Sequence, residues 1–398
     1  MITQVQVRRS AFSETRTISV ETPELAEGEI LLAIDKFAMT ANNVSYALSG
    51  DMIGYWRFFP AADPWGIVPV WGFADVVASR APGVEVGERV WGFLPMASHL
   101  VMRPTAVTDR SFTDGVAHRA ELPAIYNAYQ RTTGDPPALT AMEDERCLLF
   151  PLFSTSYVLY DYLVDNAFFG ARQVLVGSAS SKTGLGLTNL LSRHGEGRPR
   201  VVGLTSPGNV GFVTGLGTCD EVVTYDAIGA LDPAVPTAFV DMSGAGEVVS
   251  AIHVRFGDQL RLSCAVGATH WGAGRYRPET SATPHAFFFA PAQFAKRDVD
   301  WGPGEIMRRA QAESARMSRE LKGSLGIRHE RGPDAVIAAW QGLVANRIAP
   351  NEAVMASLKQ ASEELEFLAA RLSLGRHPGT RPPGRRQHDQ AHEDRLRL

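Results

Sequence analysis

Residues 174–186, VLVGSASSKTGLG, combine residue types that can bind an anion. An apolar strand at 174–176 leads into a loop of small residues, and a helix is expected to begin near Gly184. The first turn of a helix leaves backbone N–H groups without partners and carries partial positive charge, which favours phosphate oxygens. The candidate phosphate-binding residues are therefore those of this loop and turn: Gly177, Ser178, Ser180, Ser181, Lys182, Thr183, Gly184 and Gly186.

The glycine spacing in this loop matches no phosphate-binding motif completely. A dinucleotide motif reads G-x-G-x-x-G after a strand, and the glycines at 177, 184 and 186 are spaced differently. A P-loop reads G-x-x-x-x-G-K-[ST]; this loop is one residue short and has Ser181 at the second glycine. In that case Asp241, at the end of an apolar strand, could help to hold magnesium. We favour the dinucleotide interpretation, with the P-loop and a turn without a ligand as alternatives.

The end of the next strand, 200–204, suggests which dinucleotide would bind. In a βαβ nucleotide fold this strand end meets the adenosine ribose, where an acidic residue accepts hydrogen bonds from the 2′-hydroxyl of NAD. Here the residues are Thr205, Ser206 and Asn209, which offer neutral hydrogen bonds, and Lys182 could add positive charge. A carboxylate would repel a 2′-phosphate, so NADP is favoured over NAD. The alternative is that Thr-Ser-Pro-Gly is simply a turn.

The elements around these residues predict an α/β fold. Further apolar strands at 221–226, 238–241 and 260–266 alternate with helix-like segments such as 247–256, which indicates a parallel sheet covered on both faces. Ligands bind at the carboxyl ends of such strands. This adds five candidate cofactor-binding residues: Tyr225, Ser243, Gly244, Gly267 and Thr269.

The flanking segments have other patterns. Short apolar runs separated by Gly/Pro turns within the first 150 residues (29–34, 66–78 and 82–93) predict a β-barrel. After residue 285 the apolar spacing becomes helical at 304–323, and amphipathic stretches follow at 334–344 and 352–374. The tail at 375–398 is rich in Pro, Gly and charge and is expected to be disordered.

This order of elements resembles the zinc-independent branch of the medium-chain dehydrogenase/reductase superfamily, the quinone oxidoreductase and enoyl reductase type. Residues 72–77 and 87–92 resemble the family's G-x-E-x-x-G-x-V and GDRV-x-G runs, and 216–225 resembles its LGAD-x-V-I-x-Y segment. Residues 41–50 resemble the asparagine-containing loop that replaces the zinc-ligand loop in that branch. Residues 154–157 resemble the loop that places a threonine, here Thr155, near the nicotinamide. The resemblance covers residues 10–270, and SASSKT, GLTS, GATHW and FFFAP point to a subfamily without an assigned function.

The resemblance implies two domains. A GroES-like β-barrel domain would span 1–150, completed by about 285–374, and a Rossmann domain with a doubly wound parallel sheet would bind NADP at 151–284. The phosphate turn departs from the family, because residues 178–184 replace the usual Ala-x-x-Gly-x-x-Gly. Phe73-Ala74 stands where the zinc enzymes have a His-Glu pair, and Cys147, Cys219 and Cys264 are widely spaced. No metal site is therefore expected.

The resemblance further implies an NADPH-dependent reductase that transfers hydride to an activated C=C bond, a quinone or a ketone without a metal. Asn42 could orient the substrate or nicotinamide, and Tyr46 could donate a proton or simply pack in the barrel wall. His270, followed by Trp271, could act as acid, base or carboxamide partner, or could also be packing. Two alternatives from other classes are an auxiliary protein that binds cofactor without turnover and a P-loop-like nucleotide enzyme.

Bulk properties limit the partners. A net charge of −4 gives no reason to expect nucleic-acid binding. No run of 18 apolar residues and no signal-peptide pattern occur, so we expect no membrane span. Three cysteines without a pairing pattern suit the cytoplasm. Aromatic residues in loop-like contexts, including Tyr55, Trp56 and 287–289, would suit a small apolar or aromatic substrate if they converge on a pocket. The default interpretation is that they pack in the core or at a subunit interface. A homodimer is an open alternative to a monomer.

Overall fold

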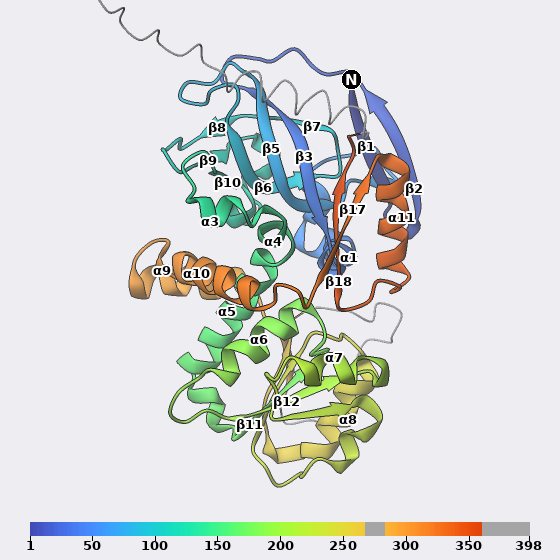
Figure 1. Cartoon of the computed structure of the whole chain (residues 1–398), viewed down its shortest axis with the longest axis vertical. Coiled ribbons are helices and arrows are strands. Elements are labelled where there is room, and N and C mark those ends of the chain that lie inside the picture. The colour runs from blue at the N-terminus through green and yellow to red at the C-terminus, as the bar shows by residue number, and fades with distance from the viewer. Residues whose placement is uncertain (267–282, 360–398) are drawn as a thin grey trace, which may run out of the picture. The chain divides into compact units, whose positions relative to one another are not determined.

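The computed structural model describes residues 1–266 and 283–359. Within this part of the chain the strands form a three-stranded, a nine-stranded and a six-stranded sheet. The first two sheets build a barrel region, and the third is entirely parallel (Figure 1). The mixed α/β class, with a GroES-like barrel beside a Rossmann sheet, is confirmed.

The barrel region takes its strands from both ends of the described chain. The three-stranded sheet has the order β2-β1-β4, and the larger sheet runs β17-β18-β3-β5-β6-β10-β9-β8 with β7 paired to β3. Figure 1 shows the orange β17, β18 and α11 beside the blue β2 and β3. The strands are β1 (Ile2–Arg8), β2 (Ala11–Val20), β3 (Ile30–Met39), β4 (Trp65–Gly66), β5 (Pro69–Ser79), β6 (Arg89–Pro95), β7 (His99–Met102), β8 (Pro104–Thr105), β9 (Ser111–Asp114), β10 (Ala128–Arg131), β17 (Gly326–Arg331) and β18 (Glu352–Ser357). The helices here are α1 (Ala41–Leu48), α2 (Gly50–Ile53), α3 (Pro137–Thr140), α4 (Glu143–Leu148) and α11 (Pro333–Val344).

The parallel sheet has the strand order β13-β12-β11-β14-β15-β16. This is the doubly wound order, in which successive strands are added first on one side of β11 and then on the other. Ligands bind at the carboxyl edge of such a sheet near this switch point. Every residue of β11 and β14 is buried, as expected for strands covered on both faces. Its strands are β11 (Gln173–Gly177), β12 (Arg200–Thr205), β13 (Glu221–Thr224), β14 (Thr237–Asp241), β15 (Leu260–Ala265) and β16 (His285–Phe287); its helices are α5 (Phe150–Asp165), α6 (Lys182–Ser192), α7 (Val210–Gly215), α8 (Gly246–Phe256), α9 (Ala290–Trp301) and α10 (Glu305–Glu320).

Two sequence-based expectations differ from the structure in detail. Helix α6 begins at Lys182 rather than near Gly184, because Ser181 takes extended backbone angles and caps the helix. The amphipathic stretch expected from 352 is wrong at its start, since 352–357 is strand β18. Val354 and Ala356 pack in the barrel core, and Ala353 and Met355 pack in a second cluster with Leu148 of α4. A run that is buried on both faces looks the same in sequence as a buried helix.

Toward the carboxyl-terminal end, two expected helices lie within the described residues, and several other predicted segments and residues do not. The helices expected at 304–323 and 334–344 correspond to α10 and α11. Residues 360–374 and the tail at 375–398 lie outside the described residues, as do Gly267, Thr269, His270 and Trp271. Among the residues that are described, no helix is both long and apolar enough to cross a membrane.

Candidate functional site

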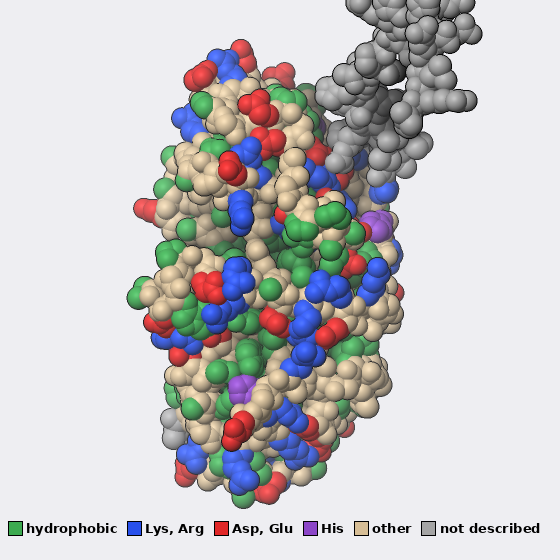
Figure 2. Space-filling view, turned by 60° about the vertical axis from the view of Figure 1, so that its left-hand side comes forward, with side chains coloured by type: hydrophobic (Ala, Val, Ile, Leu, Met, Phe, Trp, Pro, Cys, Tyr) green, Lys and Arg blue, Asp and Glu red, His purple; other side chains and the backbone are tan. Residues whose placement is uncertain are grey.

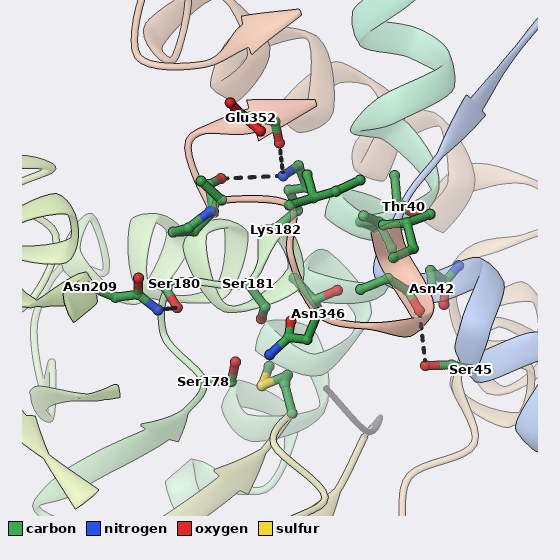
Figure 3. Close-up of a pocket in the computed structure, with 18 of the residues that line it drawn as sticks. Thr40, Asn42, Ser45, Ser178, Ser180, Ser181, Lys182, Asn209, Asn346 and Glu352 are labelled. Carbon is green, nitrogen blue, oxygen red and sulfur yellow. Dashed lines mark hydrogen bonds between the residues drawn. The ribbon is translucent and has the colours of Figure 1, made fainter. Parts of the chain in front are cut away.

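A cavity of about 420 Å³ lies where the carboxyl ends of β11 and β12 meet the loop after β3 and the segment before β18 (Figure 3). Its walls thus come from both the barrel region and the parallel sheet. Many predicted site residues line it: Asn42, Thr155, Ser178, Ser180, Ser181, Lys182, Thr183, Ser206, Asn209 and Tyr225. The lining also includes Met39, Thr40, Ala41, Ser45, Leu152, Met242, Val266, Leu343, Asn346, Arg347, Ile348, Ala349, Pro350 and Glu352.

The loop after β11 forms a turn that continues directly into α6. Ser178 adopts a left-handed backbone conformation, φ +53°, at the turn where the dinucleotide motif has a glycine. Its N–H donates to the Tyr225 hydroxyl at 3.1 Å. The Ser181 side chain accepts from the Gly184 N–H at 3.1 Å and so caps α6. The first-turn N–H groups of Lys182 and Thr183 remain as helix-end donors beside the cavity.

The three glycines predicted to bind phosphate serve to bring backbone segments together, and they do not line the cavity. A Cβ at Gly184 would lie 2.6 Å from the Ser178 carbonyl oxygen, so α6 can approach the loop only with glycine here. A Cβ at Gly177 would lie 2.6 Å from Asp241 Oδ1, and one at Gly186 would lie 2.5 Å from Ser156 Oγ. In the structure these glycines allow the loop and α6 to pack closely.

At the end of β12, small polar side chains form a connected group. Ser180 Oγ accepts hydrogen bonds from Thr205 Oγ1 at 3.2 Å and from Asn209 Nδ2 at 3.3 Å. Thr205 is buried and supports this group from behind, while Ser206 and Asn209 line the cavity. No acidic side chain from this strand end lines the cavity. The end of β12 can accept a phosphate without a repelling carboxylate.

Two residues that follow β14, Ser243 and Gly244, stabilise the end of this strand and do not line the cavity. The buried Asp241 carboxylate accepts from the Ser243 N–H at 2.8 Å, the Ser243 Oγ–H at 2.6 Å and the Gly244 N–H at 3.1 Å. Ser243 and Gly244 were predicted to contact cofactor, but Met242 lines the cavity in their place. The bonds to Asp241 fix the turn in which Met242 lies.

Lys182 extends from the first position of α6 to the segment that precedes β18. Its Nζ donates to the backbone oxygens of Glu352 at 2.7 Å and of Pro350 at 3.3 Å. Burial lowers the pKa of Lys182 to about 8, against the opposing effect of the Glu352 carboxylate. Two of the three Nζ donors are thus bonded to a distant segment and not to the loop that precedes α6.

Asn42 is held at the cavity by the start of α1. The Thr40 N–H donates to Asn43 Oδ1 at 2.7 Å, and Asn43 Nδ2 donates to the Pro69 carbonyl oxygen at 2.9 Å. These bonds fix the first turn of α1 against β5 and so place Asn42 and Ser45 on the cavity wall.

Tyr46 points away from the cavity into the barrel core. Its hydroxyl accepts a hydrogen bond from Trp71 Nε1 at 3.1 Å, and the nearby Asn42 side chain acts against the rise of its pKa. Its ring packs against Tyr55 with centroids 4.5 Å apart. Burial raises the pKa of Tyr46 well above the ordinary tyrosine value. Tyr46 therefore packs in the barrel core, and its neighbour Asn42 lines the cavity.

Sequence reasoning missed the segment 345–350, which contributes several cavity residues. Asn346 has a left-handed conformation, φ +52°, and ends α11. Arg347, which is exposed, and Ile348 follow it on the cavity wall. An Asn-Arg pair between an apolar helix and an apolar strand is a turn signal, but nothing local shows that the turn faces residues 160 positions earlier.

Within residues 1–266 and 283–359, no group of three or more His, Cys, Asp or Glu side chains is arranged to hold a metal ion. The cysteines at 147, 219 and 264 are free.

The fold is shared with several solved structures. CurA from Vibrio vulnificus in complex with NADPH is 13% identical, with 90% of this chain and 99% of that chain covered and a TM-score of 0.58. A mutant enoyl thioester reductase from Candida tropicalis is 10% identical over 89% and 99% of the two chains, with a TM-score of 0.54. CurK enoyl reductase is 14% identical over 89% and 99%, with a TM-score of 0.53. These likenesses confirm the medium-chain dehydrogenase/reductase fold.

Comparison of the sequence with known proteins identifies a family to which the chain belongs, but no curated relative. No curated protein matches the chain. A family model described as "Protein of unknown function (DUF2855)" matches residues 37–349, which is most of the chain. The chain therefore belongs to the DUF2855 family, within the medium-chain dehydrogenase/reductase fold.

Proposed function

We propose that this protein is an NADPH-dependent, zinc-free reductase that transfers hydride to an activated C=C bond, a quinone or a ketone of a small apolar or aromatic substrate. The observation that carries the proposal is the cavity at the carboxyl edge of the parallel sheet. On one side of this cavity lie the capped N-terminus of α6 and the end of β12, which has no acidic residue. Polar side chains of the barrel region also line it. CurA, which has the same fold, is described as bound to NADPH.

The residues of the cavity fit this cofactor. The N–H groups of Lys182 and Thr183 at the start of α6 would hold the pyrophosphate. Ser206 and Asn209 would accept the 2′-phosphate, because no carboxylate from β12 faces it. Thr155, on α5, also lines the cavity, and the nicotinamide would lie near it. When bound, NADPH supplies the hydride.

On the substrate side, Asn42 is the side chain best placed to assist. Its amide can donate a hydrogen bond to a substrate carbonyl oxygen, which stabilises negative charge that develops there. Tyr46 would orient Asn42 from behind and would not itself reach the substrate. Apolar side chains on the same wall, including Met39, Leu152 and Leu343, would exclude water. We further propose that the enzyme acts in the cytoplasm, which suits its free cysteines.

The test is NADPH consumption, followed by absorbance across a panel of enones, quinones and ketones. We expect turnover with at least one class. Asn42→Ala should lower kcat about 10- to 100-fold, typical for removal of one charge-stabilising donor, and leave the Kd for NADPH unchanged. Asn351→Ala is the matched control, because Asn351 is exposed and does not line the cavity. NADPH binding without consumption would favour the auxiliary protein, and no binding would refute the proposal.

A further inference from the structure

Lys182 connects two segments that are far apart in sequence. Its Nζ donates to the backbone oxygens of Pro350 and Glu352, 168 and 170 residues away (Figure 3). Both acceptors belong to the segment that enters β18, and that segment also contributes residues 346–350 to the cavity. A single side chain at the start of α6 thus holds the far wall of the cavity against the phosphate loop.

The hydrogen-bonding capacity of Lys182 is only partly used. A lysine ammonium has three N–H donors, and the two carbonyl oxygens account for two of them. No ion pair of Lys182 with a carboxylate is formed among the described residues; the Glu352 side chain acts on it only from a distance. The other titratable groups on the cavity wall are Arg347, from the same segment as Pro350, and Tyr225, whose pKa burial raises to about 12. At neutral pH the ammonium charge is therefore not neutralised by a bonded acid.

The G-x-G-x-x-G turn reserves no position for a lysine, so Lys182 is a feature of this chain's SASSKTG sequence. We propose that Lys182 is a positioning residue that clamps the 345–352 segment against the phosphate loop, and that its third N–H binds an anionic phosphate oxygen of the ligand. The clamp is a property of the free protein. The second half rests on the proposed function, because the anion is a phosphate of NADPH.

The clamp is tested without any ligand, by amide hydrogen exchange of the full chain. Lys182→Met keeps the length of the side chain and removes its donors. We expect exchange across 345–352 to become at least tenfold faster, because both bonds that tie the segment to α6 are lost. Lys182→Arg, which can still donate to two carbonyl oxygens, should restore slow exchange. Lys296→Met on α9 is the control, since its ion pairs with Asp165 and Asp300 lie elsewhere. Unchanged exchange in Lys182→Met would overturn the clamp.

The phosphate contact is tested by proton uptake. The pKa of Lys182 is lowered to about 8 in the free protein, and a bound phosphate would raise it again. Titration calorimetry with NADPH at pH 8, in two buffers of different ionisation enthalpy, should therefore show uptake of up to about half a proton by the wild type. Lys182→Met should show none. The 2′-phosphate does not confuse the result, because its second pKa near 6 leaves it fully ionised at pH 8.

The outcomes separate the inference from the proposed function. If the wild type does not bind NADPH at all, the proposed function and the phosphate contact fall together, while the exchange experiment still decides the clamp. If NADPH binds with the same observed heat in both buffers, no proton is taken up and the phosphate contact alone is refuted. If uptake persists in Lys182→Met, the proton goes to another group and the assignment to Lys182 is wrong.

Discussion

Gly184→Ala should weaken NADPH binding sharply, because the added methyl group would push α6 away from the phosphate loop. The Cβ would lie 2.6 Å from the Ser178 carbonyl oxygen and 3.0 Å from Ala179 Cα, and both are backbone atoms that cannot rotate away. To reach 3.4 Å, where ordinary contact begins, the helix start has to move by about 0.8 Å. A hydrogen bond from α6 to phosphate would lengthen from about 2.9 Å to about 3.7 Å and would be lost.

The expected loss follows from the strength of such bonds. A hydrogen bond to a charged group contributes about 1.5–3 kcal/mol. Since 1.4 kcal/mol is a factor of ten in affinity, the loss of one bond raises the Kd for NADPH about 10- to 100-fold. The assay is a fluorescence or calorimetric titration, with circular dichroism and thermal melting to confirm that the variant is folded.

Two glycine variants serve as matched controls. Gly211→Ala on α7 adds a methyl group where nothing lies within 4 Å, and in a helix it should be neutral or stabilising by up to about 1 kcal/mol. Gly186→Ala also crowds α6, but against the Ser156 and Phe153 side chains of α5, so it should lower the melting temperature more than the affinity. A folded Gly184→Ala protein that binds NADPH within twofold of the wild type would refute the placement of phosphate at α6.

Three further predictions concern charge, hydrogen bonding and pH. Ser206→Asp should raise the Kd for NADPH about 30-fold relative to the uncharged, equally sized Ser206→Asn, since like charges roughly 8 Å apart at an effective dielectric of 20 repel by about 2 kcal/mol; equal titration curves for the two variants would exclude the 2′-phosphate from the end of β12. Tyr46→Phe should lower kcat several-fold through misorientation of Asn42 and reduce unfolding stability by about 1–3 kcal/mol, because Trp71 Nε1 loses its acceptor; an unchanged kcat would show that Tyr46 does not act through Asn42. Burial and the nearby His253 lower the pKa of His285 to about 4, so the folded state binds fewer protons than the unfolded state between about pH 4 and 6.5. Stability should therefore fall as the pH drops through that window, and the fall in melting temperature should be smaller for His285→Gln; identical pH profiles would contradict the assignment.

The parallel sheet could be predicted from sequence because its signals are local. Strands such as β11 and β14 are continuous apolar runs, and each is followed by small polar residues and a helix. Strand β18 could not be identified in this way. Its residues are apolar on both faces because Val354 and Ala356 pack in one cluster and Ala353 and Met355 in another. Its pairing with β3 joins segments more than 300 residues apart.

The residues of the candidate site also fall into two groups, those that local sequence signals reveal and those that only the fold reveals. The polar side chains of residues 178–183 and 206–209 were predicted correctly to lie together, since they follow adjacent strands of one sheet. The close packing at the glycines could not be predicted, because only the three-dimensional structure shows that a Cβ at Gly177 would meet Asp241. The 345–350 segment was missed, because it reaches the cavity through the fold of the barrel region and not through any local motif.

The most direct test of the account is a thermal-shift titration with NADPH, NADH and ATP plus magnesium. A ligand at a hundredfold excess over its Kd stabilises the folded state by about 2.7 kcal/mol, which raises the melting temperature measurably. We expect a clear rise with NADPH, a smaller one with NADH and none with ATP. A rise with ATP and magnesium alone, or no rise with any of the three, would contradict it.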